Sequence, residues 1–160
     1  MIKHQCKNLT IIQIIAILSL VFLASAYFIQ YFLNISPCKL CLYQRIPYFI
    51  LVILGVLVSI KIGRKFSKNI LLNLCRIVIV VEIFLAGYHV GIERGFIHEI
   101  VPCKVESLQV GVNENLRMQI EDAQPSCKDV GLRIAGLSLA EINLIAIFCL
   151  LMLSFYKRPE

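Results

Sequence analysis

Two cysteines separated by two residues, Cys38 and Cys41, are the part of this sequence best suited to chemistry. They lie in Pro37-Cys38-Lys39-Leu40-Cys41, directly before a long apolar run in which a helix is expected to begin. A helix N-terminus has unpaired N–H groups and the positive end of the helix dipole, which stabilise a thiolate and lower the pKa of a thiol. The pair is therefore a candidate redox disulfide. A stapling disulfide or half of a zinc site is the alternative.

Arg45 and His89 are the residues best suited to hold a ligand beside this pair. Arg45 follows Cys41 by one helical turn on the same face, inside an apolar run where an arginine is costly. Its guanidinium is expected to donate to a quinone carbonyl and to stabilise the anion formed on reduction, with snorkelling to headgroups as the alternative. His89 ends another apolar run and is expected to hydrogen-bond the quinone or carry a proton, although a single interfacial histidine more often has no such role.

The composition places these residues in a membrane protein. Of 160 residues, 59% are hydrophobic and 16% are charged, whereas a soluble domain normally has about 25% charged residues. Four apolar runs reach the roughly 20 residues that a helix needs to cross a bilayer. They cover residues 10–33, 42–62, 70–91 and 137–156. The sequence therefore predicts an all-α fold, a bundle of four transmembrane helices that forms one integral membrane domain over residues 1–160.

The first run is expected to be a membrane span and not a cleaved signal peptide. Ala24-Ser25-Ala26 resembles a cleavage site, but the apolar residues continue to Leu33. The apolar core of a signal peptide is only about 7–15 residues long and ends at the cleavage site.

Lysine and arginine predict the orientation, because short cytoplasmic loops are rich in both. They lie before the first run, between the second and third, and after the fourth: Lys3, Lys7, Lys61, Arg64, Lys65, Lys68, Lys157 and Arg158. Both termini are therefore expected on the cytoplasmic face. The net charge of +6 follows from these clusters and does not indicate a nucleic-acid partner. Two loops, around 34–41 and 92–136, are expected on the opposite face, which in a bacterium is the periplasmic side.

The two periplasmic loops hold Cys38, Cys41, Cys103 and Cys127, in a compartment where disulfides persist. Four cysteines allow three pairings, and the residues alone leave these open. The four thiols could bind zinc, but Cys103 and Cys127 are not closely spaced as zinc ligands usually are, so no metal site is expected. The remaining cysteines are Cys6, in the cytoplasm, and Cys75 and Cys149, which are expected to pack within spans.

The longer loop contains apolar residues that recur among polar ones, from Val105 to Ile120. They predict either a short amphipathic helix on the membrane surface or an irregular loop that covers the helix ends. Among the charged residues, Arg76 and Glu82 lie within the third run and either snorkel or hydrogen-bond between helices. Glu141 matches the dipole at the start of the last helix. No role is assigned to Glu93.

Over nearly its whole length the sequence resembles the bacterial disulfide bond formation protein B (DsbB) family. The resemblance rests on the segment Pro37–Arg45 (PCKLCLYQR), on Tyr88–Glu93 (YHVGIE), on the later Cys103 and Cys127, and on Gly136–Glu141 (GLSLAE). It implies a quinone-dependent thiol oxidoreductase of the bacterial inner membrane, with four spans and two periplasmic cysteine pairs.

The resemblance also implies an order of electron transfer. A reduced DsbA-like thiol oxidase of the periplasm would attack a disulfide between Cys103 and Cys127, with Cys103 forming the mixed disulfide. Electrons would pass to the Cys38–Cys41 disulfide by exchange between the loops. Cys41 would deliver them as a thiolate to ubiquinone or menaquinone, held by Arg45 with His89 near its ring. A DsbA-like partner has a potential of about −120 mV, so its reoxidation needs a strong acceptor such as the quinone pool.

Two positions depart from the family pattern. Gln44 stands where an acidic residue is often found before the arginine, and Arg133-Ile134-Ala135 lies where a tryptophan is common. Both leave the quinone type and the partner open. A vitamin-K-epoxide-reductase-like enzyme is disfavoured, because in that family the C-x-x-C comes late in the chain, whereas here it lies in the first loop. A membrane protein with structural disulfides or a metal site, and no redox turnover, is the alternative of another class.

Overall fold

The computed structural model describes residues 2–60, 68–98, 125–128 and 131–155, which are mostly helical. In chain order the elements are α1 (Ile2–Phe32), α2 (Lys39–Ser59), α3 (Lys68–Glu93), β1 (Arg133–Ile134), β2 (Leu137–Ser138) and α5 (Leu139–Phe155). The helices confirm the predicted four-helix bundle. Three of them are long and apolar enough to cross a membrane, over Thr10–Phe32, Lys39–Ser59 and Asn69–Glu93, and α5 is a shorter apolar helix.

The helix ends differ from the predicted runs, because hydropathy marks the part of a helix in lipid and not its capping residues. α1 begins at Ile2, well before residue 10, and α2 begins at Lys39 instead of 42. α5 begins at Leu139 and not at 137, because Leu137 and Ser138 belong to β2. The amphipathic segment predicted between Val105 and Ile120 lies outside the described residues.

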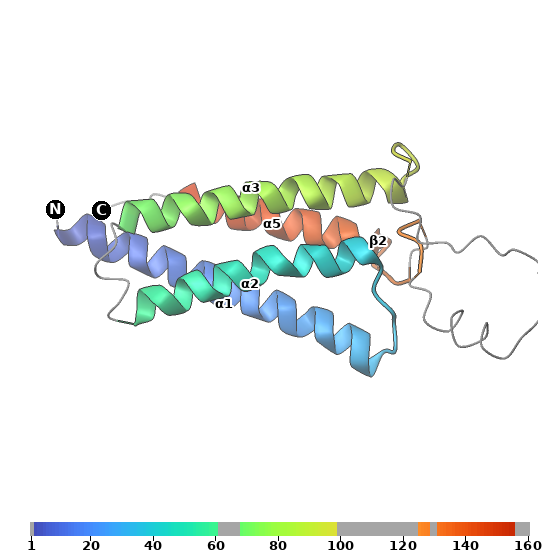
Figure 1. The fold of residues 1–160 in the computed structure, drawn as a ribbon, viewed down its shortest axis with the longest axis horizontal. Helices are drawn as coiled ribbons and strands as arrows, with labels where there is room; N and C mark the ends of the chain where they lie inside the picture. The colour runs from blue at the N-terminus through green and yellow to red at the C-terminus, as the bar shows by residue number, and fades with distance from the viewer. Residues whose placement is uncertain (1, 61–67, 99–124, 129–130, 156–160) are drawn as a thin grey trace, which may run out of the picture.

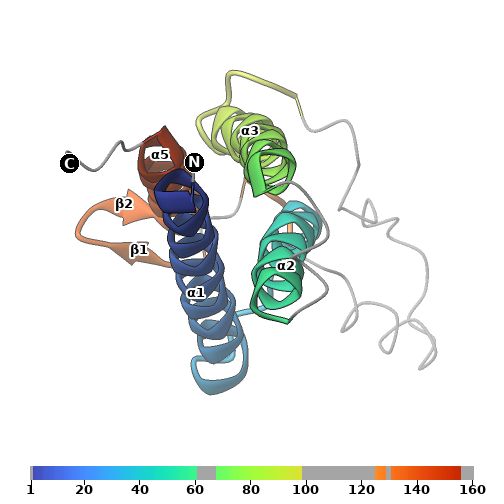
Figure 2. The same ribbon diagram turned by 90° about the vertical axis from the view of Figure 1, so that its left-hand side faces the viewer.

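The four helices surround a common axis in the order α1, α2, α3, α5, as the end-on view shows (Figure 2). α1 begins and α5 ends at one end of the bundle, which we call the termini end (Figure 1). The opposite end, where α2 and α5 begin, is called the hairpin end. α1 and α2 cross closely: a Cβ added to Gly55 would lie 2.1 Å from the Cβ of Ala16. Such small residues let membrane helices approach at backbone distance.

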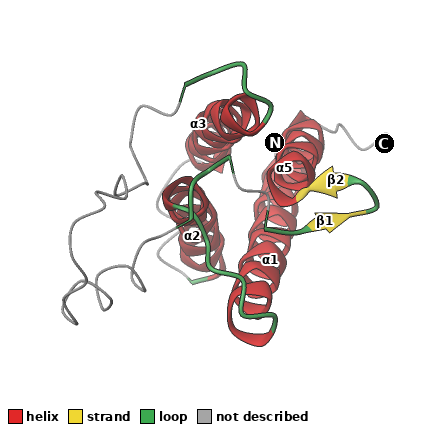
Figure 3. Cartoon of the chain, turned by 90° about the vertical axis from the view of Figure 1, so that its right-hand side faces the viewer, coloured by secondary structure: helices red, strands yellow, loops and turns green. Residues whose placement is uncertain are grey.

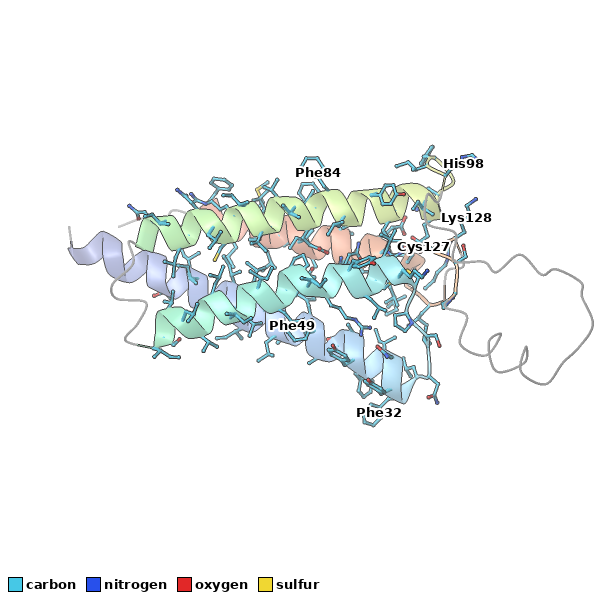
Figure 4. The ribbon with its side chains drawn as sticks, viewed as in Figure 1. Phe32, Phe49, Phe84, His98, Cys127 and Lys128 are labelled. Carbon is cyan, nitrogen blue, oxygen red and sulfur yellow. The ribbon has the colours of Figure 1, made fainter. Side chains whose placement is uncertain are left out.

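The outer surface of the bundle is apolar. Phe32 and Phe84 point away from the helices (Figure 4), and each is 74% exposed. A soluble protein rarely exposes a large contiguous apolar surface, whereas lipid tails solvate it. This surface agrees with the membrane spans.

A short hairpin precedes α5, beside α1 (Figure 3), and is a feature that the helical prediction did not contain. β1 and β2 pair antiparallel around Ala135 and Gly136, whose φ angles of 52° and 84° suit a two-residue hairpin turn. Ser138 then caps α5: its Oγ accepts from the Glu141 N–H at 3.2 Å, and the Glu141 carboxylate accepts from the Ser138 N–H at 2.9 Å. This reciprocal pair is a capping box, and it determines where α5 begins.

Two charged residues of α3 bond to α5, which is one of the two alternatives that the sequence offered for them. Near the termini end, Arg76 donates to the carbonyl oxygen of Ser154 at 2.8 Å. Near the middle of the bundle, Glu82 accepts from the Asn143 amide at 3.0 Å and is fully buried. Both side chains therefore hold α3 against α5.

Candidate active site

The C-x-x-C pair lies at the hairpin end, where α2 begins. Cys38 is the N-cap residue, and its Sγ accepts from the backbone N–H of Cys41 at 3.4 Å. The Cys38 thiol donates to the Cys41 Sγ at 3.2 Å. Because a disulfide bond is about 2.05 Å long, a displacement of about 1 Å joins the two sulfurs. The predicted position of the pair at a helix start is confirmed.

The pKa of Cys38 differs from the sequence expectation. Donation of its hydrogen bond to Cys41, together with burial, raises the pKa of the Cys38 thiol to about 12. The helix start was expected to lower the pKa of a thiol there, but the neighbouring sulfur and desolvation outweigh that effect at Cys38. In the reduced pair Cys38 therefore keeps its proton and needs a base before it can react.

His89 lies against Cys38 at the end of α3. Its Nε2 is 3.5 Å from the Cys38 Sγ, and its Nδ1 is 3.4 Å from the Oε1 of Gln44. An amide oxygen only accepts, so the Nδ1 carries the hydrogen and the lone pair of Nε2 faces Cys38. This geometry suits His89 to take the Cys38 proton. Both ring nitrogens are engaged by protein groups, a detail that the sequence did not indicate.

Cys127 brings the second loop to this pair. It is buried and lies at the hairpin end of the bundle (Figure 4). The sulfurs of Cys38 and Cys127 and a ring nitrogen of His89 all lie within 4.8 Å of one another. Cys103, its predicted partner, lies outside the described residues. The structure therefore joins three of the predicted site residues, Cys38, Cys41 and Cys127, with His89 between the two loops.

The same cluster has the donors of a soft-metal site. A zinc site with three protein ligands keeps a fourth position for another group, and Cys38, His89 and Cys127 would supply the three. The set differs from the one that the sequence suggested, since it contains His89 and does not contain Cys41, while Cys103 lies outside the described residues. Nothing in the sequence spacing relates His89 to the two cysteines.

A cavity of about 720 Å³ opens beside the C-x-x-C pair, between the helices at the hairpin end. This volume lies in the range of about 300–1,000 Å³ that small-ligand sites occupy. Its walls are largely aliphatic and aromatic, and the polar and sulfur-bearing side chains among them are Ser25, Gln30, Ser36, Cys38, Cys41, Gln44, Arg45, Tyr48, His89, Glu93, Cys127 and Asn143. Both predicted ligand-holding residues, Arg45 and His89, therefore face one cavity with Cys41.

Arg45 is held between α1 and α2 and does not extend freely to the headgroups. Its Nη1 donates to the Oε1 of Gln30 at 2.6 Å, and its guanidinium lies 4.6 Å from the centre of the Tyr27 ring. Two residues of α1 thus fix the orientation of the cation on the cavity wall. The sequence did not identify Gln30 or Tyr27, because nothing in it reveals which face of α1 packs on α2.

The deep part of the cavity has a polar pair that the sequence analysis missed. The Tyr48 hydroxyl donates to the Asn143 Oδ1 at 2.6 Å, and Asn143 in turn donates to Glu82. One signal was available: Tyr48 lies two helical turns after Cys41, on the same face of α2. Asn143, a polar residue inside an apolar run, was a second signal.

Comparisons with known proteins found a matching family and a similar protein. The family described as "Disulfide bond formation protein DsbB" matches residues 8–157. A protein of Rickettsia prowazekii (strain Madrid E), named "Uncharacterized protein RP370", is 31% identical over 168 residues, which cover 99% of this chain and 92% of the relative. No solved structure matches the chain.

Proposed function

The chain belongs to the DsbB family and is accordingly a membrane oxidoreductase of disulfide bond formation; on this premise we propose that it oxidises a periplasmic DsbA-like dithiol protein and reduces a membrane quinone. The observation that carries the proposal is the meeting of Cys38, Cys41 and Cys127 at one end of a ligand-sized cavity. One dithiol and one quinone become one disulfide and one quinol, so two electrons and two protons are transferred.

The first exchange takes place in the second loop. A thiolate of the partner attacks Cys103 in the Cys103–Cys127 disulfide, the bond between these cysteines breaks, and Cys127 leaves as a thiolate. The second thiolate of the partner then attacks the mixed disulfide, which releases Cys103 and the oxidised partner. The support for Cys127 as the departing sulfur is its buried position beside the first pair.

The second exchange joins the two loops. Cys127 as a thiolate attacks the Sγ of Cys38, the Cys38–Cys41 bond breaks, and Cys41 leaves as a thiolate that faces the cavity. The Cys103 thiolate then attacks Cys127, which breaks the Cys38–Cys127 bond, restores the Cys103–Cys127 disulfide and releases Cys38 to take a proton. Cys38 and Cys41 finally lose two electrons and two protons and reform their disulfide, and the electrons leave through Cys41. The proximity of Nε2 to Sγ suits His89 to hold the proton of Cys38 during these exchanges.

The cavity residues fit a quinone head group. Its walls are mainly apolar, as a planar ring requires, and Arg45 lies on the wall one helical turn from Cys41. The amide nitrogen of Gln44 is a buried donor without a hydrogen-bond partner among the described residues, which an acceptor in the cavity would satisfy. A bound quinone supplies the oxidant, because it accepts two electrons and two protons. The Arg45 guanidinium would hold a ring oxygen of that quinone and would stabilise negative charge on it.

The same premise gives a membrane orientation. We propose that the hairpin end faces the periplasm of the bacterial inner membrane and that both termini lie in the cytoplasm. The basic clusters support this orientation, as does the placement of the cysteine pair opposite the termini end (Figure 1). An epitope at the C-terminus should be cleaved by added protease only after the inner membrane of spheroplasts has been opened. Cleavage in intact spheroplasts would reverse the assignment.

The decisive experiment follows the absorbance of a soluble quinone analogue during turnover with purified protein and a reduced DsbA-like partner. Cys41→Ser and Cys103→Ser should each abolish quinol formation. Cys149→Ser is the matched control, because Cys149 is exposed on α5, outside the cavity wall. If the folded wild-type protein reduces no quinone with any partner tested, the redox proposal fails.

A second candidate function rests on the cluster of Cys38, His89 and Cys127. In this alternative the three residues bind a soft metal ion and no electrons are transferred. It predicts stoichiometric metal in the purified protein, which is lost when the thiols are alkylated. Metal-free protein that turns over quinone would exclude it.

A further inference from the structure

Gln44 has an unusual position in the cavity wall. Its side chain is only 5% exposed, yet its Nε2 has no hydrogen-bond partner anywhere in the described part of the chain. Its Oε1, in contrast, is held by the Nδ1–H of His89 at 3.4 Å. A buried amide donor that is left unpaired costs free energy, and such groups are rare unless a ligand or water completes them. The amide oxygen of Gln44 therefore has a structural contact, whereas the amide nitrogen lacks an acceptor.

The surroundings define the acceptor that Gln44 can meet. Gln44 lies one turn after Cys41 and one turn before Tyr48, and all three line the cavity. An amide N–H pairs with a carbonyl oxygen without placing a charge in an apolar site. Arg45, the adjacent donor, already gives one N–H to Gln30. A quinone in this cavity would offer a carbonyl oxygen that either donor could meet.

Resting on the proposed function, we propose that Gln44 is a quinone-binding residue that also positions the base at Cys38. The Gln44 Nε2 donates to a carbonyl oxygen of the quinone. The Gln44 Oε1 holds the imidazole ring of His89 so that the His89 Nε2 is directed at the Cys38 sulfur. His89 then acts on the cysteine and not on the quinone ring. One neutral side chain connects occupancy of the quinone cavity with the proton acceptor of the disulfide exchange.

The identity of the residue matters because the amide has both a donor and an acceptor. A carboxylate at position 44 would still accept from His89 but would offer no donor to the cavity, and its charge would repel the anion that forms on quinone reduction. A purely apolar side chain would lose both contacts. Two substitutions can therefore separate the two roles of Gln44.

Gln44→Glu and Gln44→Met test the proposal in purified full-length protein, with a soluble quinone analogue. Loss of the donor should raise the KM for the analogue by about tenfold in both variants. Disulfide exchange with the reduced partner, measured without quinone, should stay near the wild-type rate in Gln44→Glu and fall several-fold in Gln44→Met. Gln13→Met is the control, because Gln13 contacts Ser59 far from the cavity and should change neither quantity.

The outcomes separate the two proposals. If wild-type protein reduces the quinone and both variants keep its KM, the role of Gln44 is overturned while the proposed function stands. If wild-type protein reduces no quinone, both the role of Gln44 and the proposed function are contradicted.

Infrared spectra of the bound analogue, isotopically labelled at its carbonyl carbons, give a second measurement. A carbonyl band shifted by the wild-type protein should move back in Gln44→Met, and two unshifted bands in wild-type protein would contradict the proposal without any variant.

Discussion

Two polar clusters lie at the hairpin end, and they differ in how fully their hydrogen-bonding groups are used. In the cap cluster, Ser138 and Glu141 satisfy each other's backbone N–H groups, and Arg94 binds the Glu141 carboxylate. In the cavity cluster, the amide nitrogen of Gln44 stays unpaired within the described structure, and Cys38 keeps its proton.

The difference separates structural from chemical groups. A network whose members are all paired has no spare donor for a ligand and serves to join α3 to α5. A cluster with an unpaired buried donor, a protonated thiol and a cation on one cavity wall has groups left to engage a substrate. Substitutions in the cavity cluster should therefore change turnover, and substitutions in the cap cluster should change stability.

The largest effect is expected from Arg45 in the cavity cluster. Arg45→Met should lower kcat/KM for the quinone analogue by roughly 10- to 100-fold, because a hydrogen bond from a charged group to a developing anion is lost. Arg45→Lys should give an intermediate value, since it keeps the charge without the planar pair of donors. Steady-state assays at several quinone concentrations measure both. If Arg45→Met had wild-type kinetics, the proposal that quinone is reduced in this cavity would be wrong.

The protonation of Cys38 predicts a pH dependence. Its pKa is raised to about 12, so below that pH the thiol form dominates in the reduced protein. Alkylation of Cys38 by iodoacetamide should rise about tenfold per pH unit from pH 7 to 9 without a plateau, whereas an ordinary thiol levels off near a pKa of about 8.5. Mass spectrometry of the Cys38 peptide measures the rate.

Cys41→Ala is the informative variant for this titration. The hydrogen bond to Cys41 is the main cause of the raised pKa, so its removal should lower the pKa of Cys38 and bring a plateau into the measured range. If Cys38 in wild-type protein already reaches a plateau near pH 8, the assignment of the proton to Cys38 is wrong.

Glu82 shares one property with each of the two clusters: it has a buried atom unpaired within the described structure, as the cavity cluster does, but it lies outside the cavity wall, as the Ser138–Glu141 cap does. It is fully buried and one of its oxygens has no partner in the described residues, yet it does not line the cavity. Glu82→Leu should lower the free energy of unfolding by about 1–3 kcal/mol, because the Asn143 donor is left unpaired. Glu82→Gln keeps an acceptor for Asn143 and should stay close to wild type. Unfolding in detergent micelles measures both, and a large loss of turnover in Glu82→Gln would instead assign Glu82 a proton-carrying role.

The smallest effect is expected in the cap cluster. Ser138→Ala should lower the unfolding free energy by about 1 kcal/mol through loss of the helix cap, with the KM for quinone unchanged. The same unfolding and turnover assays apply, and Ser154→Ala is a comparison on α5, outside the cavity wall, that removes only a side-chain bond to the Leu151 carbonyl. An altered KM in Ser138→Ala would show that the two clusters are coupled.

The sequence by itself determined the fold class and indicated most residues of the candidate site. Apolar runs of sufficient length specify spanning helices, because a backbone in lipid must satisfy its own hydrogen bonds. The C-x-x-C spacing and the following apolar run placed Cys38 and Cys41 at a helix start, and helical periodicity placed Arg45 one turn beyond them. These are local properties, which depend on neighbours within one or two turns.

The tertiary structure decided which distant groups meet. Only the packing of α3 beside α2 places His89 between Cys38 and Gln44, and only the return of the chain at Cys127 adds a third cysteine to the cluster. The same packing fixes Arg45 against Gln30 and reverses the expected pKa of Cys38, because burial and a neighbouring sulfur act through space. Hydropathy shows that a helix is in the membrane but not which of its faces meets which neighbour, and the contacts of the site depend on those faces.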